Sequence, residues 1–444
     1  MEKLVMKTEK KERLGYYSYF IGQNMIYIFV TLYLSVYFTT NLGIPAATVG
    51  VIFLIARVWD AINDPLLSVI IERSHLKGGK FKPWIKSVAI LIPVLTVLNF
   101  SFTNALTAMP ISIRTIYALV MYILWGMAYT ISDAPAYALA TVMTDQASEK
   151  NRLISYAKFA GMIGLLFSMV VSPILVDKTG NWFLVAVGIS LIAFVFLNMT
   201  FMAKERVKST QNSPTLSDIL SVLFKNKYMI VIVITIVVIN GFNFAMTLTP
   251  FLTEYVYHDA SLTAVILGLS SVPMVIVAPL APRLIDKFGK NKLMIVSMLA
   301  TLILSVLTFL VARDSFVLFM ILSVLKFLLS GPLLIITALY FTDIIEYEFY
   351  TSGRRLEAVT FSVQTFTNKA VSALAGAFPM FLLGLFGFVE STGTETVVQS
   401  TQVVNGIWLI YNLGPALGAL IGLIVFVKFY DLDEAKVEAF KASK

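Results

Sequence analysis

The sequence predicts an all-helical integral membrane protein with twelve transmembrane helices arranged as two six-helix bundles. Composition is the first reason: of 444 residues, 58% are hydrophobic and only 14% are charged, and the mean hydropathy is +0.83. Soluble globular chains carry about a quarter charged residues. Too few charged side chains therefore remain to cover the surface of soluble domains.

Twelve apolar stretches are each long enough to cross a bilayer as a helix, which takes about 20 residues. The predicted spans, in chain order, are 14–40, 45–71, 84–103, 115–143, 153–176, 182–203, 229–257, 262–284, 293–312, 316–345, 358–389 and 404–429. Several exceed about 25 residues, which indicates tilt, kinks or extension into water.

The basic residues predict the orientation. Most of the 34 Lys and Arg residues lie in the two tails and in the loops after even-numbered spans, whereas the outer loops hold only Arg114, Lys178 and Arg313. Positively charged loops stay on the cytoplasmic side. We therefore expect a multi-pass cell-membrane protein with both termini in the cytoplasm, and the net charge of +8 requires no nucleic acid.

A polar segment at 204–227 divides the spans into six plus six. Within it, Thr215-Leu-Ser-Asp218 has the pattern that starts a helix, which predicts a short helix along the membrane surface. The predicted organisation is an N-terminal bundle at 1–203, this linker, a C-terminal bundle at 228–429 and a cytoplasmic tail at 430–444.

The loops that follow spans two and eight are similar. Five of the ten residues at 73–82 have the same residue type 210 positions later, at 283–292, including the pair Gly79 and Gly289. A shared basic composition is the alternative explanation, but the matched glycine favours an internal duplication. Two six-helix halves related along the membrane normal are the arrangement of major facilitator transporters, which bind substrate near the midplane.

Charged residues at membrane depth predict a cation site in span two. Asp60, Asn63 and Asp64 share one helix face, since residues three and four apart are neighbours. Adjacent carboxylates repel unless one is protonated or a cation lies between them, and oxygen ligands suit a hard cation. We expect Na⁺, Li⁺ or H⁺ at Asp60 and Asp64, with Thr130 as a further oxygen. A buried Arg57–Asp60 ion pair is the alternative, which leaves Asp64 unexplained.

Span four predicts a sugar site. Tyr129, Asp133 and Tyr137 are spaced by four residues, so one helix face carries two aromatic rings around a carboxylate. A sugar offers hydroxyls to the carboxylate and apolar C–H faces to the rings. The alternative is two core tyrosines with Asp133 paired to a lysine. Lys158 in span five and Lys369 in span eleven are candidate partners of the ligand or the carboxylates.

Further polar residues lie within the spans or at their cytoplasmic ends. Asn24, Gln364 and Thr365 supply uncharged groups for a substrate, with hydrogen bonding between helices as the alternative. A cytoplasmic gate of ion pairs that break on opening is predicted from six residues, namely Arg73, Lys77, Arg283, Lys287, Asp343 and Glu346.

Reactive chemistry is not indicated. The sequence has no cysteine and only two histidines, and it lacks the G-x-S-x-G, P-loop and H-E-x-x-H motifs. We therefore expect no enzyme activity and no cofactor, and as partners a small-molecule sugar, a coupling cation and the lipid bilayer.

Several motifs together resemble the glycoside–pentoside–hexuronide:cation symporter family. They are Asp-Ala-Ile-Asn-Asp-Pro at 60–65 and Gly-Lys-Phe-Lys-Pro-Trp at 79–84, followed by 122–130, 343–347 and 362–369. The resemblance covers nearly the whole chain in order. It implies that the four residues named for the cation match the family's ion site. It also implies a main sugar-binding carboxylate at Asp133.

On the same resemblance, Lys369 matches a lysine at the ion–sugar junction, and Gln364 and Thr365 match polar residues that face the cavity. Melibiose-type members have a lysine and a sugar-binding aspartate where this chain has Gln23 and Asn24. They also have an arginine at the place of Lys158 and a tryptophan at the place of Tyr137. These departures disfavour a galactoside and favour a hexuronide or a plant-wall oligosaccharide.

The predicted function is therefore symport of a glycoside, oligosaccharide or hexuronide with Na⁺ or H⁺, by alternating access. Two alternatives remain at this point: cation-coupled transport of an amphipathic lipid, and a sugar sensor that does not transport.

Overall fold

The computed structural model describes residues 8–74, 76–144, 146–206, 226–352, 357–392 and 397–432. These residues form helices and loops without any strand, and ten of their helices are long and apolar enough to cross a membrane. Two shorter apolar helices, Leu262–Pro273 and Phe316–Ser330, lie in predicted spans eight and ten. The all-helical membrane class is confirmed, while the count of twelve spans stays a prediction.

The helices group into two compact units. Unit 1 comprises Met1–Ser213 with the short segments Ala260–Val265 and Val389–Val398, and unit 2 contains the rest of the chain. The main boundary falls inside the predicted linker at 204–227. The surface helix predicted from Thr215 lies outside the described residues.

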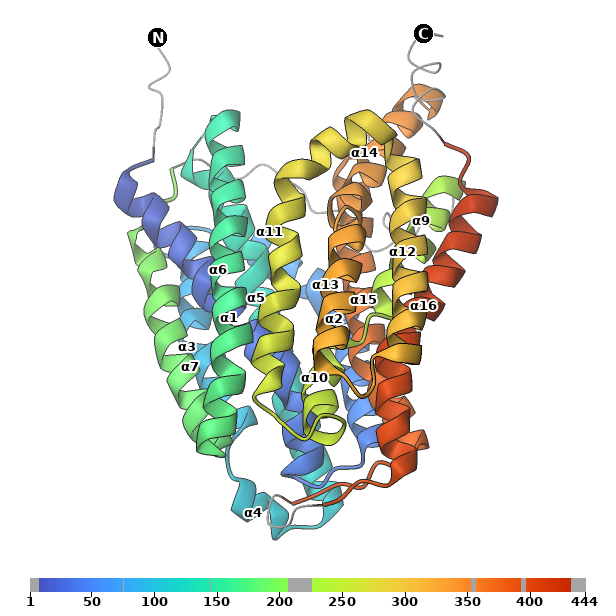
Figure 1. The fold of residues 1–444 in the computed structure, drawn as a ribbon. Helices are drawn as coiled ribbons and strands as arrows, with labels where there is room; N and C mark the ends of the chain where they lie inside the picture. The colour runs from blue at the N-terminus through green and yellow to red at the C-terminus, as the bar shows by residue number, and fades with distance from the viewer. Residues whose placement is uncertain are drawn as a thin grey trace, which may run out of the picture. The chain divides into compact units, whose positions relative to one another are not determined.

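Unit 1 contains seven α-helices and one 3₁₀ helix among its described residues. They are α1 (Lys10–Thr40), α2 (Ala46–Arg73), α3 (Lys82–Asn99), α4 (Thr103–Thr107), α5 (Ile111–Met143), α6 (Ala147–Thr179), α7 (Trp182–Asn198) and η1 (Met199–Met202). In Figure 1, α1 begins at the upper end of this unit and the short α4 lies at its lower end.

Close backbone contacts fix α1 between two neighbours. A Cβ at Gly164 of α6 would lie 2.1 Å from the Ile21 carbonyl oxygen, and a Cβ at Gly22 would lie 2.6 Å from the Ala193 carbonyl oxygen of α7. Only glycine permits such approaches, and small residues let membrane helices pack closely. The α2 and α3 helices pack against α5, which carries Tyr129, Asp133 and Tyr137 of the predicted sugar site.

Unit 2 contains eight helices in its described part. They are α9 (Lys227–Gly241), α10 (Ala245–Tyr255), α11 (Leu262–Phe288), α12 (Lys290–Val311), α13 (Phe316–Ser330), α14 (Leu333–Ser352), α15 (Glu357–Leu385) and α16 (Thr401–Phe429). The last of them, α16, packs against both α9 and α12.

Two of the long predicted spans contain a break between two helices, although residues Lys227–Tyr255 of span seven still form one candidate membrane span. Span seven breaks between α9 and α10, where the Asn243 N–H donates to the Asn240 carbonyl oxygen in a turn. Span ten breaks between α13 and α14 at Gly331 and Pro332. A proline has no N–H and disfavours helical geometry in the residue before it.

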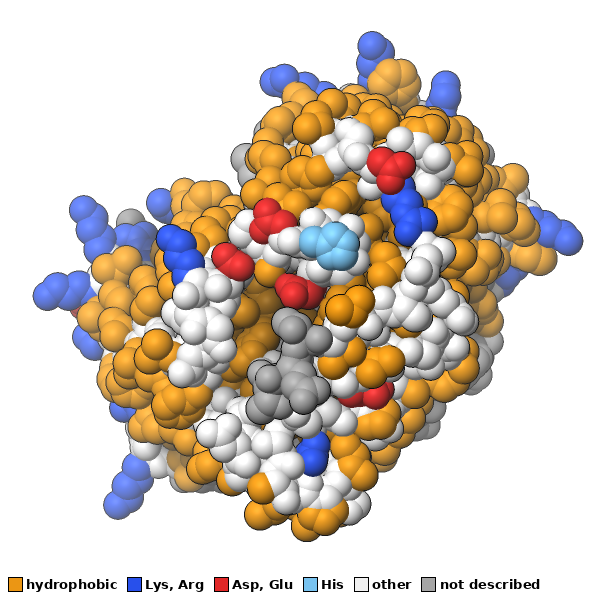
Figure 2. Space-filling model, turned by 60° about the horizontal axis from the view of Figure 1, so that its bottom comes forward, with side chains coloured by type: hydrophobic (Ala, Val, Ile, Leu, Met, Phe, Trp, Pro, Cys, Tyr) orange, Lys and Arg blue, Asp and Glu red, His pale blue; other side chains and the backbone are white. Residues whose placement is uncertain are grey.

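Large apolar side chains remain on the outside of both units. Ile116, Phe159 and Leu310 are 60%, 61% and 68% exposed, and hydrophobic side chains cover much of the surface seen in Figure 2. Exposed apolar area of this extent marks an interaction surface, and for helices of these lengths the lipid bilayer is the matching environment.

Candidate functional site

An acidic cluster lies where α2 packs against α5. Asp60 and Asn63 on α2 are only 5% and 4% exposed, and Asp64 is half-buried. The Thr130 hydroxyl of α5 lies 2.8 Å from Asp64 Oδ1 and donates to it, and it also lies 3.2 Å from the Gly126 carbonyl oxygen. The structure therefore brings together all four residues that the sequence predicts for the cation.

The Arg57–Asp60 ion pair considered as an alternative is also present. Arg57 Nη1 lies 2.9 Å from Asp60 Oδ2, and its Nη2 donates to the Tyr122 hydroxyl at 3.0 Å. This pair engages Oδ2 of Asp60, and Oδ1 takes no part in it. A Cβ placed at Gly126 would lie 3.1 Å from that second oxygen, Oδ1, so α5 approaches Asp60 closely.

Asn63 has an unusual environment within this cluster. Its amide nitrogen Nδ2 is buried and has no hydrogen-bond partner among the described residues. Buried polar groups are normally satisfied, so an unpaired one marks strain, a missing ligand or a functional role. Two carboxylates, an amide and a hydroxyl form a donor set suited to a hard monovalent cation.

The predicted sugar-binding carboxylate has a neutral partner. Gln23 of α1 is 1% exposed, and its Nε2 lies 3.2 Å from Asp133 Oδ1 and 3.2 Å from Ser132 Oγ. The Tyr19 hydroxyl lies 2.5 Å from the same Ser132 oxygen. No ion pair to Asp133 occurs within the described part of the chain, so the alternative of a lysine partner is not observed there.

Aromatic rings lie one turn to either side of Asp133. Tyr129 stacks on Trp125 at a centroid distance of 5.3 Å and contacts Tyr27 of α1 at 5.0 Å. Tyr137 contacts Phe20 of α1 at 4.9 Å. The α1 and α5 helices thus form an aromatic wall around one carboxylate. Apolar C–H faces of a ligand pack well on such rings.

Asn24 and Lys158 do not join this constellation. The Asn24 amide donates to the Phe20 carbonyl oxygen at 2.9 Å and lies against Gly161 of α6, which is the packing role considered as the alternative. Lys158 is exposed on α6 and has no hydrogen bond or ion pair among the described residues.

Comparison with known proteins decides the family. The sequence matches the family described as "MFS/sugar transport protein" over residues 15–434. This chain belongs to the MFS/sugar transport family. Together with the relatives described next, the match confirms the resemblance to glycoside–pentoside–hexuronide symporters and makes the protein a membrane transporter of sugars.

Relatives and solved structures agree with this assignment. "Uncharacterized symporter YjmB" of Bacillus subtilis (strain 168) is 30% identical, with 97% of this chain and 95% of that protein covered. "Isoprimeverose transporter" of Lactiplantibacillus pentosus is 27% identical, with 95% and 89% covered. The crystal structure of the nucleoside transporter NupG covers 94% of this chain and 99% of its own, with a TM-score of 0.70 and 14% identity, which supports the fold alone.

In this sugar transporter, the remaining predicted substrate residues lie on α15 of unit 2. Gln364 and Lys369 are half-buried, and Thr365 is exposed. Thr365 and Lys369 are four residues apart and therefore lie on one face of the helix. Their roles stay predictions.

The residues predicted for a cytoplasmic gate are only partly described. Lys77, Arg283 and Lys287 are exposed, while the side chains of Arg73 and Glu346 lie outside the described part. The sixth, Asp343 of α14, forms an ion pair with Lys290 of the same unit. The gate stays a prediction, since this pair lies within one unit.

Sequence reasoning did not name Gln23 as a site residue, although its place was noted as a departure from related proteins. A glutamine in the middle of an apolar span is a signal in itself, because an amide at membrane depth needs a partner. What the sequence lacks is the rotation of α1, which decides whether Gln23 or Asn24 contacts α5.

Proposed function

We propose that the protein is a symporter that uses a Na⁺ or H⁺ gradient to import a glycoside or hexuronide by alternating access. The observation that supports this most is the placement of Thr130 and Asp133 three residues apart on α5. Thr130 donates to Asp64 in the acidic cluster, and Asp133 accepts from Gln23 beside the aromatic wall. One helix therefore connects the candidate ion site with the candidate sugar site.

The Thr130 hydroxyl provides a coupling step. It carries a single proton and has two acceptors, Asp64 Oδ1 at 2.8 Å and the Gly126 carbonyl oxygen at 3.2 Å. A cation at Asp64 would compete for that carboxylate oxygen. Thr130 would then donate to Gly126 and present its lone pairs to the cation.

This reorientation takes place one helical turn from Asp133. If it changes the affinity of the Asp133 site for sugar, the sugar changes the affinity for the cation by the same factor, since linkage is reciprocal. A coupled carrier requires a dependence of this kind, and coupling energies of about 1–3 kcal/mol are typical.

The sugar site offers an acceptor and apolar faces. Gln23 donates to one oxygen of Asp133, so the second oxygen keeps its lone pairs for sugar hydroxyls. A hexuronide would require a cation for its own carboxylate, and Lys158 on α6 is the candidate in unit 1. The name of the isoprimeverose transporter supports a sugar as the substrate of this chain also.

The experiment is uptake of labelled glycosides, pentosides and hexuronides into vesicles with an imposed Na⁺ or proton gradient. Wild type is compared with Asp64→Asn and with Asp177→Asn, an exposed carboxylate of the same unit as control. We expect gradient-driven uptake of one sugar class, lost in Asp64→Asn and kept in Asp177→Asn.

Thr130→Val tests the coupling step in the same assay. Because valine offers no oxygen to the cation, the cation concentration for half-maximal uptake should rise about tenfold, which corresponds to about 1.4 kcal/mol. If sugar uptake by wild type depended on neither gradient, the protein would be a facilitator. That result would reject the cation site. Uptake of a lipid and no sugar would favour lipid transport instead, and binding without counterflow would favour a sensor.

A further inference from the structure

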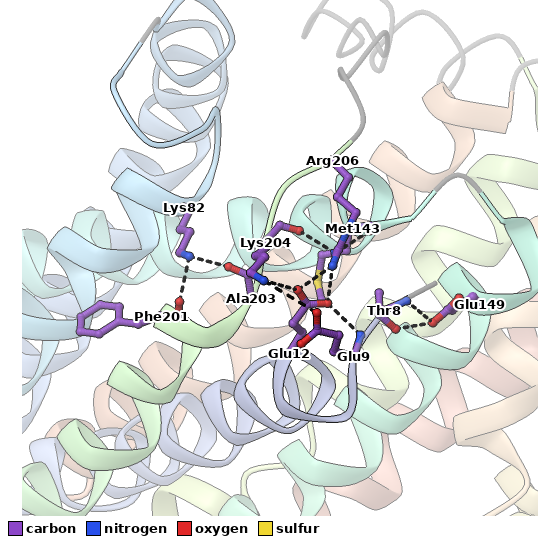
Figure 3. Close-up of polar contacts among 10 residues, drawn as sticks. All are labelled: Thr8, Glu9, Glu12, Lys82, Met143, Glu149, Phe201, Ala203, Lys204 and Arg206. Carbon is purple, nitrogen blue, oxygen red and sulfur yellow. Dashed lines mark hydrogen bonds and ion pairs between the residues drawn. The ribbon is translucent and has the colours of Figure 1, made fainter. Parts of the chain in front are cut away.

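The chain segment that follows the sixth predicted span is fastened to the rest of unit 1 (Figure 3). We call residues 203–206 the exit segment, because the chain continues from it into the linker between the bundles. The segment contains a lysine, a glutamate and an arginine in succession, and Ala203 before them is fully buried. Each of the two last side chains contacts a different helix end.

Glu205 occupies a cradle of backbone donors at the start of α3. Its carboxylate accepts the N–H groups of Lys80 at 2.7 Å, Phe81 at 2.9 Å and Lys82 at 2.7 Å. Successive N–H groups at a helix start form an anion-binding site, strengthened by the helix dipole.

Gly79 is required beside this cradle for two reasons. Its φ is +126°, which side-chain-bearing residues rarely adopt, and a Cβ there would lie 2.6 Å from the Glu205 carboxylate. The Gly-Lys-Phe-Lys sequence at 79–82 therefore has a local role within unit 1.

Lys82 of the same loop donates hydrogen bonds back toward the exit segment. Its Nζ donates to the carbonyl oxygens of Phe201 at 2.8 Å and Ala203 at 2.5 Å, as Figure 3 shows. These carbonyls end η1 and would otherwise lack helical partners. The loop at 80–82 and the exit segment thus exchange donors and acceptors in both directions.

Arg206 binds the ends of two other helices. Its Nη2 lies 2.6 Å and 2.8 Å from the two Glu12 oxygens at the start of α1, and its backbone N–H donates to the Val142 carbonyl oxygen near the end of α5 at 2.7 Å. Glu12 is 1% exposed. Without Arg206, this buried carboxylate would keep only the longer contact with Lys204 Nζ, at 3.8 Å, and the Glu9 N–H.

The order of the two charges fixes the register of the segment. A slip of one residue would bring Arg206 to the N–H cradle, where donors would face donors, or Glu205 to Glu12, where two carboxylates would repel. The alternation of the two charges therefore selects one register of the segment.

We propose that Glu205 and Arg206 form a clasp that positions the exit of the linker and makes the predicted cytoplasmic ends of α1, α3 and α5 move as one body. The effect of the clasp on transport rests on the proposed function. In alternating access the two bundles move, and the linker joins them. When the contacts of Glu205 and Arg206 are broken, the exit segment moves by itself and the three helix ends no longer move with it. Turnover therefore depends on the clasp, and sugar affinity does not.

The test compares Glu205→Ala, the milder Glu205→Gln and the exchanged pair Glu205→Arg with Arg206→Glu. The exchanged pair keeps composition and net charge but reverses both contacts. Asp431→Asn is the matched control, since Asp431 is an exposed carboxylate after the last helix of unit 2. The full-length protein is studied in lipid nanodiscs and vesicles.

Amide hydrogen exchange at residues 80–82 reports the clasp without any transport assay. We expect exchange to accelerate about tenfold or more in Glu205→Ala and in the exchanged pair, and to stay unchanged in Asp431→Asn. In vesicles, Vmax of Glu205→Gln should fall about tenfold while KM for the sugar changes less than about twofold.

Three results would overturn the proposal. They are unchanged exchange at 80–82 in Glu205→Ala, wild-type behaviour of the exchanged pair, and a rise in KM at constant Vmax. If wild type transports no sugar, the proposed function fails, and the exchange measurement alone still decides whether the clasp exists.

Discussion

Asp133 and Asp343 lie 210 residues apart, the same offset that relates the similar loops after spans two and eight, yet their partners differ in kind. Asp133 in α5 accepts from the neutral amide of Gln23 and is flanked by tyrosines. Asp343 in α14 pairs with Lys290 at the start of α12. Asp343 therefore has a cationic partner, whereas the partner of Asp133 is neutral.

This difference predicts separate tasks for the two carboxylates. A carboxylate without a cationic partner in a low dielectric has a high free energy, which a ligand with donors can lower. A carboxylate paired with lysine gains little from such a ligand. The comparison therefore predicts that ligand chemistry depends on Asp133 and that packing of unit 2 depends on Asp343.

The largest expected effect is the loss of sugar binding in Asp133→Asn. Two hydroxyl hydrogen bonds to a charged acceptor are lost or weakened, so affinity should fall about 1,000-fold. Binding of the sugar identified by the uptake panel, measured by isothermal titration on the purified protein, checks this.

Asp343→Asn is the matched control for that measurement. It should bind the sugar within about threefold of wild type, because hydrogen bonds at the other unit are unaffected. Equal losses of affinity in the two variants would contradict the division of tasks between the two carboxylates.

The sequence allows the class, the family and the residues of the acidic cluster to be predicted, for definite reasons. Composition and span length decide a membrane fold, and i, i+3 and i+4 spacing decides that Asp60, Asn63 and Asp64 share a face. Thr130 was anticipated as a further oxygen toward span two, and its hydroxyl bonds Asp64.

Partners on other helices could not be predicted in the same way. Gln23 contacts Asp133, Glu205 contacts the loop at 80–82 and Lys290 contacts Asp343. Each contact joins segments that are far apart in the sequence. Kinks were expected in spans as long as seven and ten, but their positions were not predicted, because the apolar composition continues through the turn. These contacts and breaks depend on tertiary packing, which cannot be predicted from the hydrophobic periodicity of a single span.

A smaller effect is expected from the pair that neutralises Asp343. Lys290→Met alone should lower the free energy of unfolding by about 2 kcal/mol, less than for a fully buried pair, because the side chains are 10% and 15% exposed. Lys290→Met combined with Asp343→Leu should recover part of this loss, since no charge is then left alone. Thermal unfolding in detergent measures both variants. A double variant less stable than the sum of the single changes would contradict the explanation.

The segments that follow the last helix of each unit also differ in their contacts. After the last helix of unit 1, Glu205 and Arg206 make short contacts with buried groups. After the last helix of unit 2, Asp431 lies 3.3 Å from Lys227 at the start of α9, with the two side chains 55% and 61% exposed. Both units thus tie their final segment to the start of their own first helix, but with unequal strength.

The smallest expected effect follows from that exposure. Asp431→Asn should change the free energy of unfolding by less than about 0.5 kcal/mol, because exposed ion pairs gain little Coulomb energy in water and lose side-chain entropy. The change should vanish at 1 M salt, where charges are screened within about 3 Å. Arg206→Met, which removes the short contacts of buried Glu12 and leaves it only the 3.8 Å contact with Lys204 and the Glu9 N–H, should be destabilising at either salt concentration. Equal destabilisation of Asp431→Asn and Arg206→Met in thermal unfolding would contradict the conclusion that the two end contacts differ in strength.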